Sequence, residues 1–326
     1  KTFDENGVYV SVANVSEKVK YIKSHRFLAI SRAVNEKELT VKIEVDENYI
    51  LENIKKYKIP SNASTSKDLV FEAYKDGLKR LLLPSLKREA LTLLKEKSSS
   101  EAINLFGKNL KELLLTPPLV NQVILGMDPG YVSGCKLAVI DENGNYLASN
   151  VIYPTKPKED FITSAKIVLE LIKKYKINSI AIGNGTASQE TAAFISKLIN
   201  ENNLDVKYAV VSEIGASVYS ASKIAMMEYP NLDVTIRGAI SIAQRLRDPM
   251  AALVKIDPKS LGIGQYQHDV NQKELEQKLE NVTVDLVNKV GVDINSASYK
   301  LLSFISGISE KLALNIIEHK EKIKNF

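Results

Sequence analysis

Three acidic residues occupy positions that suit metal-dependent chemistry on phosphodiesters. Asp128 ends a short apolar run and precedes the glycine-containing turn Pro129-Gly130. Glu213 follows a later apolar run, and Asp248 stands in the segment Arg245–Pro249. Two metal ions about 4 Å apart need several converging carboxylates to hold the attacking and leaving oxygens. Asp128, Glu213 and Asp248 are therefore the candidate catalytic residues, and Asp128 and Glu213 are the candidate ligands for Mg²⁺.

Each of these acids also has a structural interpretation. A turn aspartate such as Asp128 often only shapes its loop. An aspartate before a proline, as Asp248 is, often only ends a helix, and Asp257 is a weaker candidate for a third ligand. The nearby arginines would either contact phosphates or neutralise the acids: Arg237, Arg245 and Arg247.

A second motif joins an expected strand to an expected helix through small residues. Gly183, Gly185 and Thr186 lie in the run Ile182–Ser188. Free amides at a helix start bind phosphate well, so these three residues are candidate phosphate-binding groups. The run is not a Walker loop, because no lysine precedes Thr186. The alternative is a tight turn in which Thr186 or Ser188 caps the helix.

A third motif lies near the end of the chain. Ile305-Ser306-Gly307-Ile308-Ser309 separates two helical patterns, which is the arrangement of a helix-hairpin-helix. The amides of such a hairpin grip a phosphate without reading bases. Gly307, Ser309 and Lys311 are therefore candidate nucleic-acid contacts, together with the three arginines above. The same motif also serves as a protein-interaction scaffold that needs no nucleic acid.

The elements that must position these residues follow from the apolar patterns. After Pro117-Pro118, short apolar runs alternate with helical spacing, and Asn143-Gly144 marks a hairpin turn. Three strands in a meander, followed by alternating helices and strands, predict a mixed sheet with helices on both faces. Strands are expected at about 123–128, 136–140, 146–153, 177–182 and 206–211.

The preceding region is expected to be mostly helical. Apolar spacing over 68–94 favours a helix that Pro84 would kink or divide, and Ser100 would cap a second helix ending near Leu115. The expected organisation is a helical region at 1–121, an RNase H-like domain at 122–250, a connector at 251–281 and a truncated helix-hairpin-helix at 282–326, whose first helix is expected at about 282–290.

Composition limits the classes of protein. The net charge is +5, and residues 1–121 carry all of it, with 21 Lys and Arg against 16 Asp and Glu. This charge permits a polyanionic partner without requiring one. The single cysteine, Cys135, excludes an internal disulfide and a cysteine-based zinc site, and favours the cytoplasm. No apolar run is long enough for a transmembrane helix. A chain that begins at Lys1 and ends within a helical pattern is expected to be a fragment.

The sequence resembles the Tex family of transcriptional accessory proteins. The resemblance is carried in order by DPGYVSGCK at 128–136, AIGNGTASQET at 181–191, VSEIGASVYSAS at 211–222, LDVTIRGAISIAQRLRDP at 232–249, LVKIDPKSLGIGQYQHDV at 253–270 and VNKVGVDINSAS at 287–298. It implies a YqgF-type RNase H-like domain followed by helix-hairpin-helix units. It also implies that an N-terminal region and a C-terminal OB-fold RNA-binding domain lie outside this chain. Ser309 stands where the family's hairpin often has a second glycine.

Three functions are compatible with these patterns. The favoured one is a factor that binds RNA or DNA together with the transcription machinery, with a catalytically silent RNase H-like domain. The alternative is a Mg²⁺-dependent nuclease or resolvase acting through Asp128, Glu213 and Asp248. An actin-like ATPase would need a duplicated core, and the sequence has one such unit.

Overall fold

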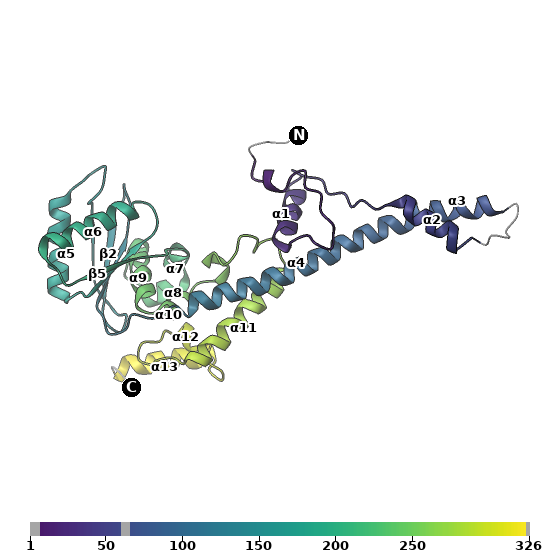
Figure 1. Ribbon diagram of the computed structural model, residues 1–326. Coiled ribbons are helices and arrows are strands. Elements are labelled where there is room, and N and C mark those ends of the chain that lie inside the picture. Colours follow the sequence, from purple (N-terminus) through teal and green to yellow (C-terminus); the bar gives the residue numbers. More distant parts are fainter. Residues whose placement is uncertain (1–6, 60–65, 324–326) are drawn as a thin grey trace. The chain divides into compact units, whose positions relative to one another are not determined.

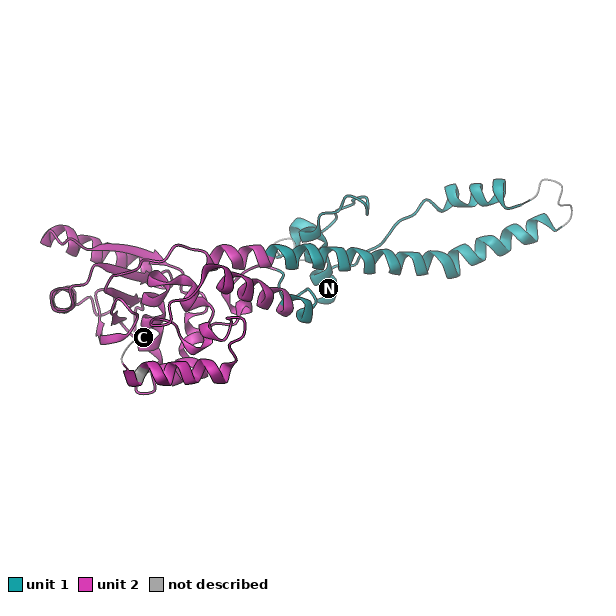
Figure 2. Cartoon of the chain, turned by 90° about the horizontal axis from the view of Figure 1, so that it is seen from below, with its two compact units in different colours: residues 1–105, 266–275 teal, residues 106–265, 276–326 magenta. Residues whose placement is uncertain are grey.

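The structure is a computed structural model that describes residues 7–59 and 66–323 (Figure 1). The chain divides into two compact units, shown in different colours in Figure 2. The first unit contains residues 1–105 and 266–275, and the second contains residues 106–265 and 276–326. The helix α4 (Leu83–Leu114) passes from one to the other.

The first unit is helical, as the sequence predicts. Besides the first part of α4, its elements are η1 (Val10–Val12), α1 (Ser24–Asn35), α2 (Glu47–Tyr57), α3 (Lys67–Gly77) and the π-helical segment η2 (Leu78–Leu82). The π turn lies just before Pro84, which has no N–H to donate to a carbonyl one turn earlier. The helix accommodates this missing hydrogen bond by a π-helical turn and continues through Pro84.

The predicted helix start at Ser100 is wrong. The helix α4 runs without a break through that residue. Its buried side chains include Ile103, Phe106, Leu110 and Leu114, which recur every three or four residues. The packing of this continuous face outweighs the local tendency of a serine to begin a helix.

Within the first unit, the segment 266–275 is held to α1 by a two-pronged ion pair. The guanidinium of Arg32 donates from Nε to both carboxylate oxygens of Asp269, at 3.1 and 2.9 Å, and Nη2 also donates to Oδ2. The same guanidinium lies 4.8 Å from the ring centroid of Tyr266. Residues more than 230 positions apart in the sequence are thus joined.

A five-stranded mixed sheet forms the centre of the second unit, in the order β3-β2-β1-β4-β5. Its strands are β1 (Ile124–Asp128), β2 (Cys135–Ile140), β3 (Tyr146–Ile152), β4 (Ser179–Gly183) and β5 (Lys207–Val211). The first three pair antiparallel, and β4 and β5 continue parallel to β1. This topology confirms the predicted RNase H-like fold class.

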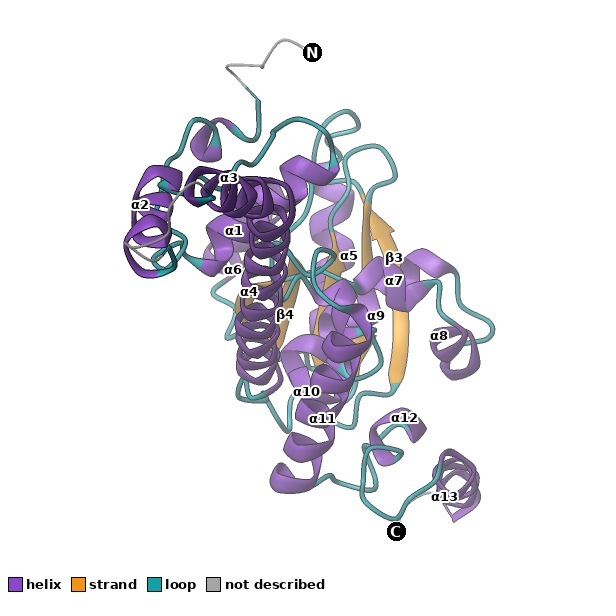
Figure 3. Ribbon diagram, turned by 90° about the vertical axis from the view of Figure 1, so that its right-hand side faces the viewer, coloured by secondary structure: helices purple, strands orange, loops and turns teal. Residues whose placement is uncertain are grey.

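Helices cover both faces of this sheet, as Figure 3 shows for the orange strands and the surrounding helices. Alternate residues of each strand point to opposite faces. On one face Leu125 and Ile180 pack with α5 (Phe161–Tyr175) and α6 (Ser188–Asn202). On the other face Ile124 and Ala181 pack with α9 (Val234–Arg247).

The contact between β1 and α9 is unusually close. A Cβ added to Gly126 would lie 2.2 Å from the backbone oxygen of Ala239 and 2.8 Å from the Cβ of Ala243. Glycine at 126 therefore allows the helix to lie directly on the first strand.

The remaining elements of the second unit are helical. They are α7 (Ala216–Ser220), α8 (Lys223–Glu228), α10 (Pro249–Leu253), η3 (Pro258–Leu261), α11 (Gln272–Val290), α12 (Tyr299–Leu302) and α13 (Glu310–Ile323). The first four residues of α11 belong to the first unit. The helix expected from about 282 begins ten residues earlier, because the Asn271 carboxamide accepts from the amides of Lys273 and Glu274 and so caps it. Within the described ranges, no helix combines the length and apolarity that crossing a membrane requires.

Candidate functional site

Asp128 and Glu213 face the same pocket. Asp128 ends β1, and Glu213 lies two residues beyond the end of β5. Because β1, β4 and β5 are parallel, their carboxyl ends meet at one edge of the sheet. Both acids line a pocket of about 290 Å³ at this edge, which is completed by residues of α7 and α9.

The glycine turn after β4 accommodates the carboxylate of Glu213. A Cβ on Gly185 would lie 1.9 Å from Oε1 of Glu213, and a Cβ on Gly183 would lie 3.0 Å from Oε2. The side chain of Asn184 fixes this arrangement, because its Oδ1 accepts from the Glu213 amide at 3.0 Å. Gly183, Gly185 and Thr186 were predicted to bind phosphate. In the structure, the carboxylate of Glu213 occupies the space beside the two glycines, and its negative charge would repel a phosphate.

The alternative prediction, that Thr186 or Ser188 caps α6, is also wrong. Its N-cap is Ala187, which has a left-handed backbone (φ 62°) and makes no side-chain capping bond. Thr186 is exposed and Ser188 is buried. The turn is thus shaped by backbone conformation, for which the sequence carries no simple signal.

The surroundings of Asp128 make its carboxyl a weaker acid than an ordinary aspartate. Burial is the main cause that raises the pKa of Asp128 to about 6, and the negative charge of Glu213 is the second. The positive charge of Lys136 acts in the opposite direction. Lys136 faces Asp128 across the β1–β2 pair, and its ammonium donates to the carbonyls of Ser133 (2.8 Å) and Gly134 (3.0 Å). The lysine thus ties the loop after β1 to the sheet as well as supplying positive charge.

Asp248 does not join the other two acids. Its carboxylate caps α10 by accepting from the Ala251 amide at 2.9 Å. Asp257, the weaker candidate, caps η3 in the same way through Lys259. The expected convergence of three carboxylates is therefore corrected. Asp248 ends α9, as its structural interpretation predicts, but the carboxylates of both aspartates cap the starts of the helices that follow them. Among the residues that the structure describes, no three His, Cys, Asp or Glu side chains gather as a metal site.

The helix α9 presents non-acidic residues to the pocket: Val234, Thr235 and Gly238. A Cβ on Gly238 would lie 2.9 Å from Oδ2 of Asp128. Sequence reasoning missed Gly238, although a glycine inside a helical pattern signals close packing or function, because it costs helix stability.

The three arginines proposed as phosphate contacts are buried, each at most 9% exposed. Arg237 donates to the carbonyls of Tyr229 and Ser220, Arg245 to that of Ser212, and Arg247 to that of Glu142. Burial lowers the pKa of Arg245 to about 10, against the opposing effect of Glu213. The three guanidinium groups are thus withdrawn from the open surface of the unit, which corrects the expectation that they form a surface contact for nucleic acid.

The hairpin near the end of the chain has the expected form. Between α12 and α13, Gly307 has a left-handed backbone (φ 89°) and is exposed. Ser309 begins α13, and its hydroxyl accepts from the Leu312 amide at 3.2 Å. Lys311 is exposed on the first turn of α13. The residue types needed for a phosphate contact are therefore at the surface in this hairpin.

The fold and the hairpin define the class: an RNase H-like domain joined to a helix-hairpin-helix module. The particular family follows from comparison with known proteins. Residues 122–247 match the family model described as the Tex protein YqgF-like domain, and residues 287–326 match the helix-hairpin-helix motif. The resemblance to the Tex family is thereby confirmed.

Named relatives extend the similarity over most of the chain. It is 48% identical over 242 residues to protein tex of Bordetella pertussis, covering 74% of this chain and 31% of that protein. It is 43% identical over 318 residues to the transcriptional accessory protein Tex of Neisseria gonorrhoeae, covering 94% and 41%. It is 40% identical over 314 residues to human S1 RNA-binding domain-containing protein 1, covering 93% and 31%.

The chain spans less than half the length of these curated relatives. Among solved structures, it is similar to Thermus thermophilus RuvC in complex with a Holliday junction substrate, at 16% identity and a TM-score of 0.28, over 37% of this chain and 90% of that one.

Proposed function

We propose that this protein is a nucleic-acid-binding accessory factor of transcription whose RNase H-like domain does not cleave its ligand. Its partners are RNA or DNA and the transcription machinery, in the cytoplasm. The names of its relatives support the role in transcription, and an exposed hairpin with Gly307, Ser309 and Lys311 supports contact with phosphates.

The main support for a domain that does not cleave is the lack of an acidic residue on the face of α9 that lies toward Asp128. A two-metal nuclease needs carboxylates from several elements around its metals. Here α9 lines the pocket with Val234, Thr235 and Gly238, none of them acidic, and Asp248 caps another helix. The remaining pair, Asp128 and Glu213, acts within the fold, with Glu213 seated on the glycine turn.

The competing function is a Mg²⁺-dependent nuclease. Two carboxylates facing one pocket suit a single Mg²⁺ that keeps several waters, so Asp128 and Glu213 would hold the ion and it would neutralise their mutual repulsion. Hydroxyl groups of Ser217 and Thr235 line the same pocket. This donor set fits one ion and lacks the acids that a second ion requires.

Two measurements test the proposal. Branched DNA and structured RNA are incubated with the protein and Mg²⁺ or Mn²⁺, with Asp128→Asn as the control for a contaminating nuclease. We expect no cleavage that depends on Asp128, and cleavage lost in Asp128→Asn would overturn catalytic silence. Binding of the same ligands is measured by fluorescence anisotropy at several salt concentrations. We expect affinity to fall steeply with salt, and a flat response would contradict phosphate contacts.

A further inference from the structure

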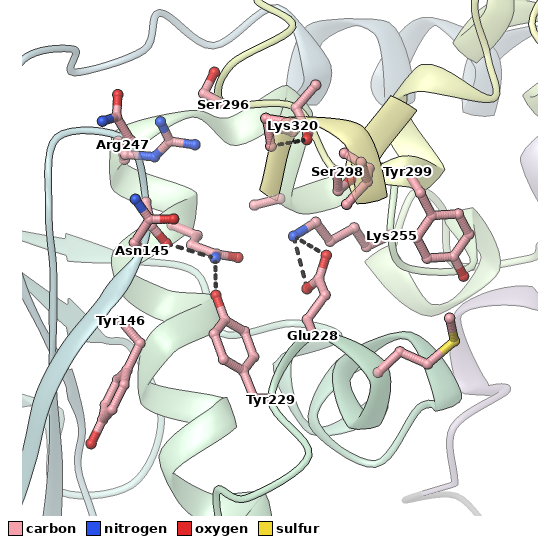
Figure 4. A pocket seen from close by; sticks show the side chains of 18 of the residues that line it. Asn145, Tyr146, Glu228, Tyr229, Arg247, Lys255, Ser296, Ser298, Tyr299 and Lys320 are labelled. Atoms are coloured by element: carbon pink, nitrogen blue, oxygen red, sulfur yellow. Dashed lines mark hydrogen bonds and ion pairs between the residues drawn. The ribbon is translucent and has the colours of Figure 1, made fainter. Parts of the chain in front are cut away.

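A second cavity of the second unit lies at the end of α9, whereas the pocket of the acidic pair is lined by the start of that helix. It has a volume of about 610 Å³. Its walls come from the β2–β3 turn, α8, the end of α9 and the segments around α12 and α13 (Figure 4). Small-molecule sites in proteins commonly have volumes of roughly 300–1,000 Å³. The cavity thus has the size of a ligand site where the RNase H-like domain meets the helix-hairpin-helix.

Arg247 places a buried positive charge with an unused hydrogen-bond donor in the wall of the cavity. It is 7% exposed, its Nε has no hydrogen-bond partner among the described residues, and no carboxylate there forms an ion pair with it. Within the described part of the chain, its guanidinium donates a single long hydrogen bond, 3.4 Å from Nη1 to the Glu142 carbonyl. A buried charge without a counter-ion is costly, and an anion bound beside it would offset that cost.

The guanidinium of Arg247 is held in place before any ligand arrives. A Cβ on Gly144 would lie 2.9–3.0 Å from its Nε, Cζ and Nη2, so the turn covers one side of the group. The Arg247 carbonyl accepts from the Leu119 amide at 2.8 Å, which anchors the end of α9. Figure 4 shows the guanidinium directed toward the cavity.

The other charges around the cavity do not neutralise Arg247. Lys255 is paired with Glu228 at 2.8 Å, so these two cancel. Lys320, which also lines the cavity, donates to the carbonyls of Asn295 and Ala297. Glu318 is the other acid in the lining, and it is exposed. Arg247 is therefore the buried charge of the wall that neither Glu228 nor Glu318 pairs with.

We propose that this cavity binds a phosphate ester of mononucleotide size, with the phosphate on Arg247. A guanidinium binds two phosphate oxygens through parallel hydrogen bonds, which suits a planar group with unused donors. The amide of Gln244, the hydroxyl of Ser296 and the apolar side chains of Leu314 and Ile317 line the remainder, where a nucleoside fits. A free nucleotide and the phosphorylated end of a strand offer the same chemistry. The site is separate from the hairpin contacts proposed above.

The test is calorimetric titration of the whole chain with inorganic phosphate, adenosine monophosphate and adenosine. We expect saturable binding of the monophosphate, at least about tenfold tighter than adenosine, since a charge-assisted pair of hydrogen bonds is lost without the phosphate. Arg247→Met should weaken the monophosphate about tenfold or more. Arg245→Met, which removes a buried arginine of the same helix that donates to Ser212 outside the cavity, should bind as the unaltered protein does.

A second variant decides the outcome if Arg247→Met does not fold. Ser296→Asp places a carboxylate in the partly exposed wall without removing a buried side chain, and it should weaken the monophosphate about tenfold through like-charge repulsion. Oligonucleotides with and without a 5′-phosphate then distinguish a strand end from a free nucleotide. Equal affinity for adenosine and its monophosphate, undiminished binding by Ser296→Asp, or no binding of either phosphate compound would refute the proposal, whatever the result of the nucleic-acid binding assay.

Discussion

Gly185 lies directly against the carboxylate of Glu213, so that a Cβ at position 185 would be 1.9 Å from Oε1. The atoms in the way are the far end of a flexible side chain, which can swing aside. At Gly126, in contrast, the obstacle is the backbone oxygen of Ala239 at 2.2 Å. The same substitution therefore has different consequences at the two positions.

Gly185→Ala is expected to lower the free energy of unfolding by about 1 kcal/mol or less, and Gly126→Ala by about 3 kcal/mol, because only the latter forces a helix off a strand. Urea denaturation of both variants measures this difference. Gly77→Ala is the control, because nothing lies within 4 Å of its added Cβ, and alanine favours helix there. Equal losses at 126 and 185 would contradict the packing described here.

Gly185→Ala should also lower the pKa of Asp128, because Glu213 moves away and one cause of the raised value is removed. Titration of the Asp128 carboxyl by NMR, in the presence of a chelator, follows this change. A pKa that stays near 6 would mean that burial alone sets it.

The raised pKa of Asp128 predicts that stability falls as the pH rises. Between about pH 4 and pH 6 the unfolded chain releases the proton that the folded chain retains, so the folded state is penalised, and above about pH 6 the penalty is complete. A pKa of about 6 limits the resulting loss in free energy of unfolding to about 3 kcal/mol. Because the carboxyl is partly exposed, solvent screening reduces this loss to about 1–2 kcal/mol.

Asp128→Asn removes this penalty. The variant is therefore expected to be more stable than the unaltered protein at pH 8 by about 1–2 kcal/mol, and the advantage should disappear near pH 4. Denaturation curves at both pH values, with chelator present, provide the measurement. Asp285→Asn, on an exposed position of α11, is the control and should change little at either pH. A destabilised Asp128→Asn at pH 8 would contradict the described electrostatics.

Lys311→Glu is expected to weaken nucleic-acid binding without affecting folding, since the side chain is exposed beside the hairpin. Loss of one phosphate contact should reduce the slope of log affinity against log salt by about 1. Anisotropy titrations over a salt series measure the slope. Lys173→Glu on α5, also exposed, makes the same charge change away from the hairpin. Equal effects of the two variants would indicate that general charge, and not the hairpin, provides the binding.

Arg32→Lys should loosen the segment 266–275 from α1 in the first unit. A lysine cannot make the two-pronged contact with Asp269, and we expect a loss of about 1–2 kcal/mol. Hydrogen exchange of the amides in 266–275 reports the local opening. Arg80→Lys is the matched control, because its pair with Asp76 is exposed and such pairs contribute little. Unchanged exchange in Arg32→Lys would show that the segment is held by other contacts.

Local patterns in the sequence were sufficient to predict the strands, the hairpin turn at Asn143-Gly144 and the helix-hairpin-helix. Apolar alternation and turn residues act over a few positions, and the sheet in the structure follows them. The edge at which Asp128 and Glu213 meet was also predictable, because the carboxyl ends of parallel strands share one side. The resemblance to the Tex family rested on the residues of these same elements.

Long-range packing decided the rest. The helix α4 runs through Ser100 because its buried face continues, Asp248 became a cap, and the arginines of α9 were drawn into the interior. Gly185 and Gly238 are small because two carboxylates lie against them, which no nearby residue in the sequence indicates. The cavity beside Arg247 exists only where segments from four parts of the chain meet. Such features depend on which surfaces touch, and the free energy of those contacts is set by the folded chain and not by any local segment of it.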